Sequence, residues 1–189
     1  MPRATMTALL ARLRRMISDK ADGSQTFTDD DLQDFLDTSR SEVRYLPLTP
    51  VETIAPGGLV QWRIFAAPWG DWEDNAELVD TGFNVLPLAG SGNVLTSDLL
   101  TGRWTFSQGV TPSVRLSGFT YDLAAAAVDA LEAWAGTEKL KYDFASADQK
   151  LSRSQMMQSL LSLAANYRNK CRPVTVTMIR GDVAREWGG

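Results

Sequence analysis

A short stretch rich in tryptophan and carboxylate side chains holds the residues best suited to chemistry. Residues 67–77 read APWGDWEDNAE, with Trp69 and Trp72 on either side of a glycine. Paired tryptophans can stack on sugars or bases, and clustered carboxylates can hold calcium. The spacing of the acids does not follow the calcium-loop pattern D-x-[DN]-x-[DN]-G, however. Carboxylates also repel the backbone of a nucleic acid.

Three interpretations of residues 67–77 remain open: a ligand site, a structural loop, or an exposed loop that packs on a neighbouring protein. The third interpretation accounts for both residue types, because aromatic side chains are enriched at protein interfaces. We therefore expect Trp69 and Trp72 to contact another protein chain.

The residues that most often carry catalysis are scarce. The chain of 189 residues contains no histidine, so it lacks the commonest general base and the commonest metal ligand. Its one cysteine, Cys171, falls on the inner face of a predicted helix and has no histidine to activate it. The sequence patterns of phosphate-binding loops and of the G-x-S-x-G nucleophile elbow are absent. We predict that the protein is not an enzyme and that it has no metal site and no cofactor.

Composition and charge narrow the class of protein. Hydrophobic residues make up 44% of the chain and charged residues 22%, as in an ordinary globular protein. The formal net charge is −4, whereas a general nucleic-acid binder is usually basic. The apolar run Thr7–Ala11 is too short for a signal-peptide core, and no run approaches the length of a membrane span. We expect a protein made and kept in a cytosol, without membrane contact.

Two helices are expected near the N-terminus. Apolar residues recur at three- and four-residue spacing over 5–17, and again from Thr28 to about Tyr45. Thr28 is a natural N-cap, and the carboxylates at 29–31 suit the positive end of the helix dipole. Three successive helical side chains diverge around the axis, so a helix start explains these acids better than a metal site.

A second pair of helices is expected within residues 120–173, joined by a short polar connection. One begins near Leu123 and the other at an N-cap at Ser152, and Pro173 ends the second. A short connection makes such helices antiparallel neighbours. Their predicted core residues are Leu131, Trp134, Leu160, Leu163 and Tyr167. The small side chains of Ala124 and Ala125 let another backbone come close, either from the partner helix or from another subunit.

Residues 51–119 differ in character, because prolines and glycines recur and β-branched or aromatic residues alternate with polar ones. Strands are predicted at 59–66, 77–81, 84–88, 103–107 and 113–117, with a hairpin turn at 100–103. The predicted fold is α+β. Residues 1–50 and 120–173 would form an antiparallel bundle of about four helices, with a small antiparallel β-sheet inserted at 51–119 and an extended C-terminal tail at 174–189.

The C-terminal segment PVTVTMIRGDVAREWGG begins with strand-like alternation and has no hairpin partner beside it. A free apolar terminus is a liability, so we expect the segment to add to a sheet edge, in this chain or in another. The residues expected to make this contact are Val174, Val176, Met178, Ile179, Arg180, Val183, Arg185 and Trp187. Trp187 is the strongest candidate for a binding hot spot.

The order of these elements resembles the head–tail connector (adaptor) proteins of long-tailed bacteriophages. The resemblance covers residues 5–173 and is sharpest over 114–173. It rests on the stretches FTDDDL at 27–32, VRLSGFTYDL at 114–123, LSRSQ at 151–155 and YRNKCRP at 167–173. The inserted β region is larger than in the minimal helical members of the family.

The resemblance implies a structural virion protein, assembled in the host cytoplasm and located at the head–tail junction. Such proteins form a ring, generally of twelve copies, beneath the portal protein. The ring extends the DNA channel without sequence-specific binding and carries a stopper or tail-completion protein. A C-terminal extension commonly grips the portal, which would be the role of residues 174–189 here. Trp69, Trp72, Ala124 and Ala125 would then contact neighbouring subunits or the neck.

Two other classes of function stay open from the residues themselves. Trp62, Trp69 and Trp72 could make a carbohydrate- or ligand-binding β module carried on a helical scaffold. The basic helix end at 168–172 could belong to a small nucleic-acid-binding regulator.

Overall fold

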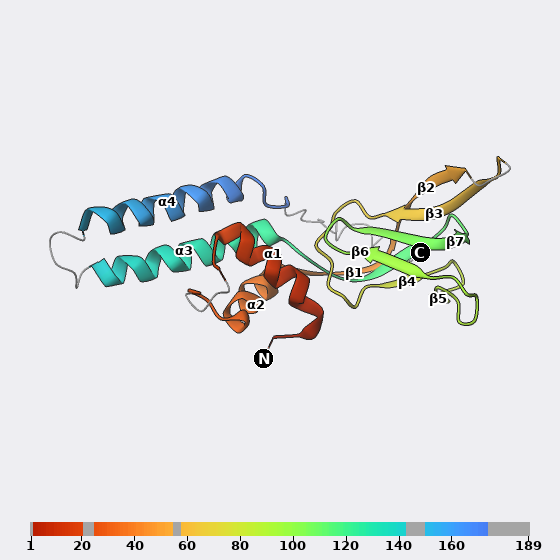
Figure 1. The fold of residues 1–189 in the computed structure, drawn as a ribbon, viewed down its shortest axis with the longest axis horizontal. Helices are drawn as coiled ribbons and strands as arrows, with labels where there is room; N and C mark the ends of the chain where they lie inside the picture. The colour runs from red at the N-terminus through yellow and green to blue at the C-terminus, as the bar shows by residue number, and fades with distance from the viewer. Residues whose placement is uncertain (1, 21–24, 55–57, 143–149, 174–189) are drawn as a thin grey trace, which may run out of the picture.

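The computed structural model describes residues 2–20, 25–54, 58–142 and 150–173. Within them the fold is α+β, with four α-helices and eight β-strands arranged in two antiparallel sheets of four strands each (Figure 1). Strands are the dominant elements, so the predicted helical bundle with one small inserted sheet is wrong. The physical reason is that the chain between the second and third helices builds two complete sheets rather than a minor insertion.

The N-terminal helices are short and are held together by a buried arginine. A 3₁₀ turn at Ala4–Met6 leads into α1 (Thr7–Ile17), and α2 follows at Asp29–Thr38. The predicted N-cap is confirmed, since Thr28 and Asp31 form a reciprocal capping box. The buried Arg14 lies 2.7 Å from Asp19 and 2.7 Å from Asp29, which ties the end of α1 to the start of α2.

The second helix ends seven residues earlier than the sequence pattern indicates. It stops at Thr38, and residues 40–47 form the strand β1 (Arg40–Pro47) instead of continuing to Tyr45 as a helix. β1 pairs antiparallel with β8 (Arg115–Tyr121), with Arg40 opposite Tyr121 and Pro47 opposite Arg115. Backbone pairing with a strand about 75 residues away has therefore overridden the local helical pattern.

The two sheets have different strand orders. The first contains β1, β8, β4 (Glu77–Val79) and β5 (Val85–Leu86), in that order. The second contains β2 (Thr49–Ile54), β3 (Val60–Ala66), β7 (Arg103–Val110) and β6 (Leu95–Asp98), in that order. Between them lies a core of side chains that includes Phe65, Trp72, Trp104, Phe106 and Leu116. Leu48, at the crossing from β1 to β2, is buried in this core as well.

The remaining two helices lie side by side at the opposite end of the molecule from the sheets (Figure 1). They are α3 (Leu123–Tyr142) and α4 (Lys150–Arg168), and α4 begins two residues before the predicted N-cap at Ser152. A second core joins these helices to α1 and α2. Leu131 and Leu160 are buried in it, and Trp134, Leu163 and Tyr167 are partly buried against it. The predicted core of the helix pair is thus located where the pattern indicates.

Candidate functional site at the junction of helices and sheets

The loop with the two tryptophans closes over the turn between β6 and β7. Asp71 N donates to Leu100 O at 3.3 Å, and Trp72 N donates to Leu99 O at 3.1 Å. Gly70 makes this approach possible, because a Cβ at that position would lie 2.1 Å from the carbonyl oxygen of Leu100. The loop is thereby fixed between the second sheet and β8, to which Trp72 is joined by an isolated bridge at Thr120.

The two tryptophans have different environments. Trp72 is 1% exposed and its indole donates to Trp69 O at 2.9 Å, so it belongs to the core between the sheets. Trp69 is 37% exposed and stacks on Trp72 with a ring-centroid distance of 6.5 Å and an interplanar angle of 12°. Of this pair, Trp69 alone therefore presents a substantial ring surface to the outside.

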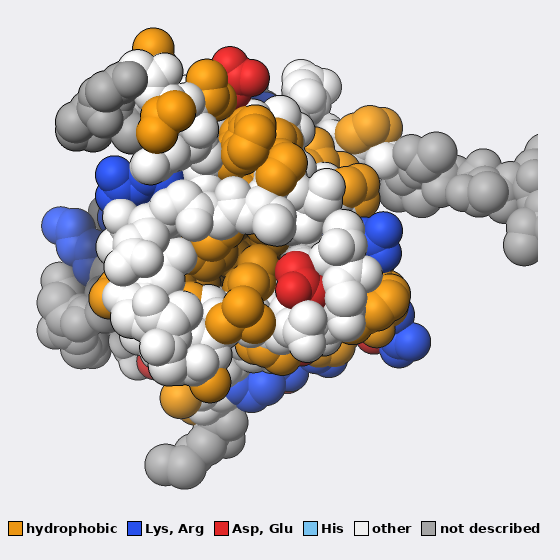
Figure 2. All heavy atoms as spheres, turned by 90° about the vertical axis from the view of Figure 1, so that its right-hand side faces the viewer, with side chains coloured by type: hydrophobic (Ala, Val, Ile, Leu, Met, Phe, Trp, Pro, Cys, Tyr) orange, Lys and Arg blue, Asp and Glu red, His pale blue; other side chains and the backbone are white. Residues whose placement is uncertain are grey.

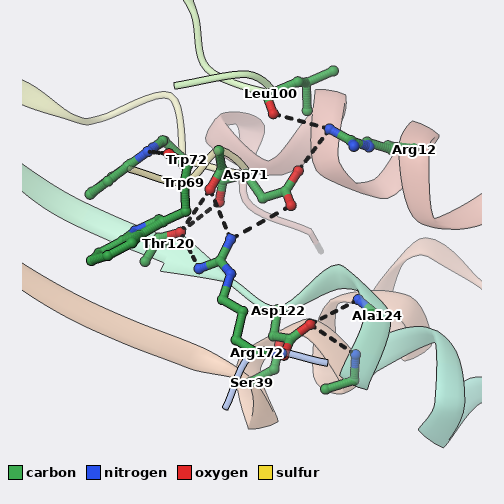
Figure 3. Close-up of polar contacts among 12 residues, drawn as sticks. Arg12, Ser39, Trp69, Asp71, Trp72, Leu100, Thr120, Asp122, Ala124 and Arg172 are labelled. Carbon is green, nitrogen blue, oxygen red and sulfur yellow. Dashed lines mark hydrogen bonds and ion pairs between the residues drawn. The ribbon is translucent and has the colours of Figure 1, made fainter. Parts of the chain in front are cut away.

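Arg172 connects the end of α4 to this loop. Its guanidinium donates to Gly70 O at 2.9 Å and to Thr120 Oγ1 at 2.9 Å, and it lies 3.6 Å from a carboxylate oxygen of Asp71 (Figure 3). Its backbone N–H donates to Asp122 Oδ2 at 2.6 Å. Burial lowers the pKa of the Arg172 guanidinium, while the nearby carboxylates of Asp71 and Asp122 act in the opposite direction.

Asp122 has a second function in the same cluster. Its other carboxylate oxygen accepts from Ala124 N at 3.0 Å and Ala125 N at 3.1 Å, so it caps the N-terminus of α3 (Figure 3). One carboxylate thus holds the first turn of α3 and Arg172, which lies four residues after the end of α4. The two ends of the helical hairpin are fixed to each other and to the β part at one point.

Asp71 completes the cluster from the loop side. Its backbone has a φ of 61°, in the left-handed region, and its carboxylate accepts from Arg12 Nη1 of α1 at 2.9 Å. Burial raises the pKa of the Asp71 carboxyl, and the charges of Arg12 and Arg172 oppose that rise. Three segments distant in sequence, α1, the tryptophan loop and the end of α4, therefore meet around one carboxylate.

A second buried carboxylate lies behind the loop. Glu73 is 1% exposed and accepts from Tyr121 Oη at 2.6 Å and from Thr5 Oγ1 at 2.5 Å. Arg3 donates to the Tyr121 hydroxyl at 3.0 Å and pairs with Asp37 of α2. Burial and the hydrogen bond to Glu73 raise the pKa of the Tyr121 phenol. This network fixes the start of the chain to the sheet and leaves its carboxylate fully occupied.

A cleft of about 810 Å³ opens at the same junction. It lies beside β1 and β8, with Ser41, Val43 and Thr120 among its lining residues. Trp69 lines it on one side, and the last two described residues, Arg172 and Pro173, line it as well. Ala125 and Asp129 of α3 also contribute to its lining. The cleft is therefore bordered by most of the elements that the Arg172 cluster brings together, namely the tryptophan loop, β8, the start of α3 and the segment after α4.

The residues that the sequence predicts as protein contacts lie in different environments in the structure. Trp69 lines the cleft, whereas Trp72 is interior; Ala124 and Ala125 are half-buried at the start of α3. The predicted tail contacts, from Val174 to Trp187, lie outside the described residues.

Among the described residues, no three cysteine, aspartate or glutamate side chains are grouped so that they could hold a metal ion. In that same part of the chain no helix is long and apolar enough to cross a membrane.

Sequence reasoning missed the residues that organise the junction. The sequence pattern places Arg172 among the cations of a helix end and Asp71 among the clustered acids of residues 67–77, and it assigns no role to Asp122. The position of Asp122 directly before an apolar helix was an available signal for an N-cap. The pairing of Arg172 with a loop about 100 residues earlier leaves no signal in the local sequence.

Comparison with known proteins finds no relative of this chain. No protein-family model, no curated protein and no solved structure matches this chain.

Proposed function

We propose that the protein is a head–tail adaptor of a bacteriophage particle, a structural protein that forms a ring of about twelve copies under the portal. The ring would extend the DNA channel and join the capsid to the neck, with a stopper or tail-completion protein below it. The proposal comes from the resemblance over residues 5–173, and the reasons that follow come from the geometry of the chain.

The observation that carries the proposal is the anchoring of Arg172. Hydrogen bonds from its guanidinium and its backbone fix the end of α4 to the junction between helices and sheets. The sixteen residues 174–189 therefore follow a residue that is hydrogen-bonded to the junction. A segment that docks on another protein gains from a fixed starting point, because less conformational entropy is then lost when the segment binds.

The elongated form of the subunit is a second support. Figure 1 shows the α3–α4 hairpin at one end and the two sheets at the other. Figure 2 shows hydrophobic side chains gathered on the end formed by the sheets. The exposed hydrophobic residues of the β part include Tyr45, Ile54, Leu59, Val60, Phe83, Val85 and Val94. Exposed apolar patches of this kind suit contacts with neighbouring proteins.

The geometry favours this proposal over the two alternatives. A carbohydrate platform built on Trp69 and Trp72 would need both rings exposed, but Trp72 is 1% exposed. A nucleic-acid contact at 168–172 would need free cations, but Arg168 pairs with Glu132 and Arg172 lies in the junction cluster. The acidic net charge of −4 is compatible with a channel through which DNA slides without being held.

The proposal is tested by attachment to capsids that carry the portal with which the proposed adaptor would assemble. We expect the intact protein to co-sediment with portal-bearing capsids and the truncated chain 1–173 to remain in the supernatant. Trp187→Ala should weaken attachment strongly, since tryptophan dominates binding hot spots. Glu186→Ala, a change at the neighbouring position, is the matched control and should attach normally.

Circular dichroism of the truncated chain separates loss of docking from loss of folding. A folded truncated chain that no longer attaches supports the adaptor role. Normal attachment of the truncated chain, or equal effects of Trp187→Ala and Glu186→Ala, would show that the tail is not the portal-binding element.

A further inference from the structure

Two aromatic side chains with unusual backbone conformations lie together on the first sheet. Tyr45 and Phe83 have φ values of 55° and 61°, in the left-handed region that bulky residues rarely adopt. Their rings meet edge to face with centroids 5.2 Å apart, although the two residues are 51% and 56% exposed. Neither residue belongs to a core cluster, so core packing does not account for the strain. Strained residues of this kind gather at sites that bind ligands.

Hydrogen bonds hold both backbones in these conformations. Tyr45 lies in a bulge where the register of β1 against β8 shifts, and bulges redirect side chains. Its N–H donates to Ser117 Oγ of β8 at 3.0 Å. The Phe83 N–H donates to Asp80 O at 3.1 Å, in the turn between β4 and β5. The aromatic pair is therefore preorganised by the sheet and its turn.

A pocket of about 320 Å³ lies at this pair, and both side chains line it. Leu116 of β8 and Leu78 of β4 are buried in the core between the sheets. Ser117 and Phe119 of β8 also line the pocket, and they lie on the opposite face from Leu116 because side chains alternate along a strand. The pocket is therefore on the outer face of the first sheet.

Two carboxylates flank β8 in the lining of this pocket. Glu42 of β1 is opposite Phe119, and Glu77 of β4 is opposite Ser117. Directly opposite residues share a face of the sheet, so both carboxylates lie on the outer face, one on each side of β8. Glu42 accepts from Arg44 Nε at 2.7 Å in an exposed ion pair, a type that contributes little. The exposed side chain of Glu77 has no hydrogen-bond or ionic partner within the described part of the chain.

Arginines of this chain already stack on two aromatic rings of the pocket lining. The Arg40 guanidinium lies 3.5 Å from the ring centroid of Phe119. The Arg115 guanidinium lies 5.8 Å from the ring centroid of Phe83. The face of an aromatic ring attracts a cation electrostatically, which accounts for both contacts. Tyr45 supplies a third ring to the pocket, and about half of that residue is open to solvent.

An arginine side chain from outside the molecule fits these groups best. A planar guanidinium can stack on an aromatic ring and donate to a carboxylate at the same time, which a lysine ammonium does less well. We propose that the pocket binds an arginine side chain of another protein chain, with the guanidinium stacked on Tyr45 and hydrogen-bonded to Glu77. This binding is independent of the head–tail role, because it depends on the pocket alone.

Titration of the protein with two small probes tests the pocket. N-acetyl-arginine amide carries the guanidinium, and N-acetyl-citrulline amide has nearly the same shape without the charge. Nuclear magnetic resonance follows the ring signals of Tyr45 and Phe83, assigned with Tyr45→Asn and Phe83→Asn because asparagine tolerates a left-handed backbone. We expect saturating shifts with the arginine probe and an affinity at least about threefold lower for the citrulline probe, which cannot make a cation–π contact.

Substitution of single carboxylates locates the bound guanidinium. Glu77→Gln removes the proposed partner charge, so it should lower the affinity for the arginine probe by at least about threefold. Glu52→Gln is the matched control, because Glu52 is an exposed carboxylate on β2 that does not line the pocket. It should leave the affinity unchanged.

The titrations give results that either support or overturn the arginine pocket. Saturating shifts that weaken with the citrulline probe and with Glu77→Gln, but not with Glu52→Gln, support it. Equal binding of the two probes, a linear drift without saturation, or equal effects of the two glutamine substitutions would overturn it. No portal is present in these titrations, so a negative result leaves the capsid-attachment test unaffected.

Discussion

At the scale of single residues, Arg172 is the side chain on which the junction depends. Its guanidinium bonds to Gly70 and Thr120 and lies near Asp71, while its side chain is 32% exposed. Arg172→Ala removes these bonds and leaves the half-buried Asp71 with one arginine partner. We expect a loss of about 1–3 kcal/mol in the free energy of unfolding, the range for a charged group that loses buried partners.

Urea denaturation measures this loss, with Arg15→Ala as the control. Arg15 is exposed on α1, so its replacement removes the same charge without disturbing the cluster. Equal stability of the two variants would mean that Arg172 does not fasten the end of α4.

Gly70 is the second residue for which the geometry makes a sharp prediction. A Cβ there would lie 2.1 Å from the Leu100 oxygen, a contact with backbone that cannot move independently. Gly70→Ala should therefore cost at least about 1–3 kcal/mol, as for other overpacked sites. Gly136 in α3 has nothing within 4 Å of the same position, and Gly136→Ala should stabilise the helix by about 0.5–1 kcal/mol. Chemical denaturation should show a lower free energy of unfolding for Gly70→Ala and a higher one for Gly136→Ala. A lower value for both variants would contradict this description of the loop.

Tyr121 carries the pH dependence that the structure predicts. Burial, and then the hydrogen bond to Glu73, raise the pKa of its phenol above the ordinary value of 10.0. Below pH 10 both the folded and the unfolded chain keep the proton, so this group adds no pH dependence. Above pH 10 the unfolded chain ionises first, so the stability contributed by Tyr121 declines as the pH rises.

Ultraviolet titration of the phenolate tests the raised pKa of Tyr121 in the folded protein. Parent and Tyr121→Phe should show the same absorbance change near pH 10, because the phenol that differs between them stays protonated. A phenolate signal that is smaller by one group in the variant at that pH would mean that Tyr121 titrates normally.

At the scale of elements, the α3–α4 pair is the part that sequence patterns predict best. Its apolar positions are local and periodic, so Leu131 and Leu160 could be assigned to a core without knowledge of the rest. Leu160→Ala should cost about 2–5 kcal/mol, the usual range for a buried leucine. Leu161→Ala, at a side chain 44% exposed, should cost far less. Thermal unfolding compares the two, and similar melting temperatures would show that Leu160 is not a core residue.

The β1 strand shows why other elements could not be predicted. Leu32, Phe35, Leu36 and Val43 continue one helical spacing, and neither glycine nor proline interrupts residues 28–45. The helix nevertheless ends at Thr38, because Arg40–Val43 pair with residues 118–121 of β8. β2 was missed for a related reason, since Pro50 argues against a strand interior and is tolerated here because β2 is an edge strand. In both segments the secondary structure is set by pairing with strands that are distant in the sequence. A local sequence pattern carries no information about such pairing.

At the scale of the whole molecule, the junction joins two differently built ends into one molecule. The helical core and the core between the sheets are separate clusters, connected by β1, β8 and the residues around Arg172. Sequence patterns predicted both the helices and several strands of this arrangement, but not that the β part would form two full sheets. The strand partners lie up to 81 residues apart, as for Arg40 and Tyr121, which is why their number and order were not predictable.

We propose above that this protein forms a ring under a portal. Electron microscopy of the portal with which the proposed adaptor would assemble, purified and mixed with the intact protein, tests this proposal most directly. We expect a coaxial ring of about twelve subunits on the tail-facing side of the portal, and no ring with the chain 1–173. A portal that stays bare in the presence of intact protein, or protein bound elsewhere on it without rotational order, would contradict the claim.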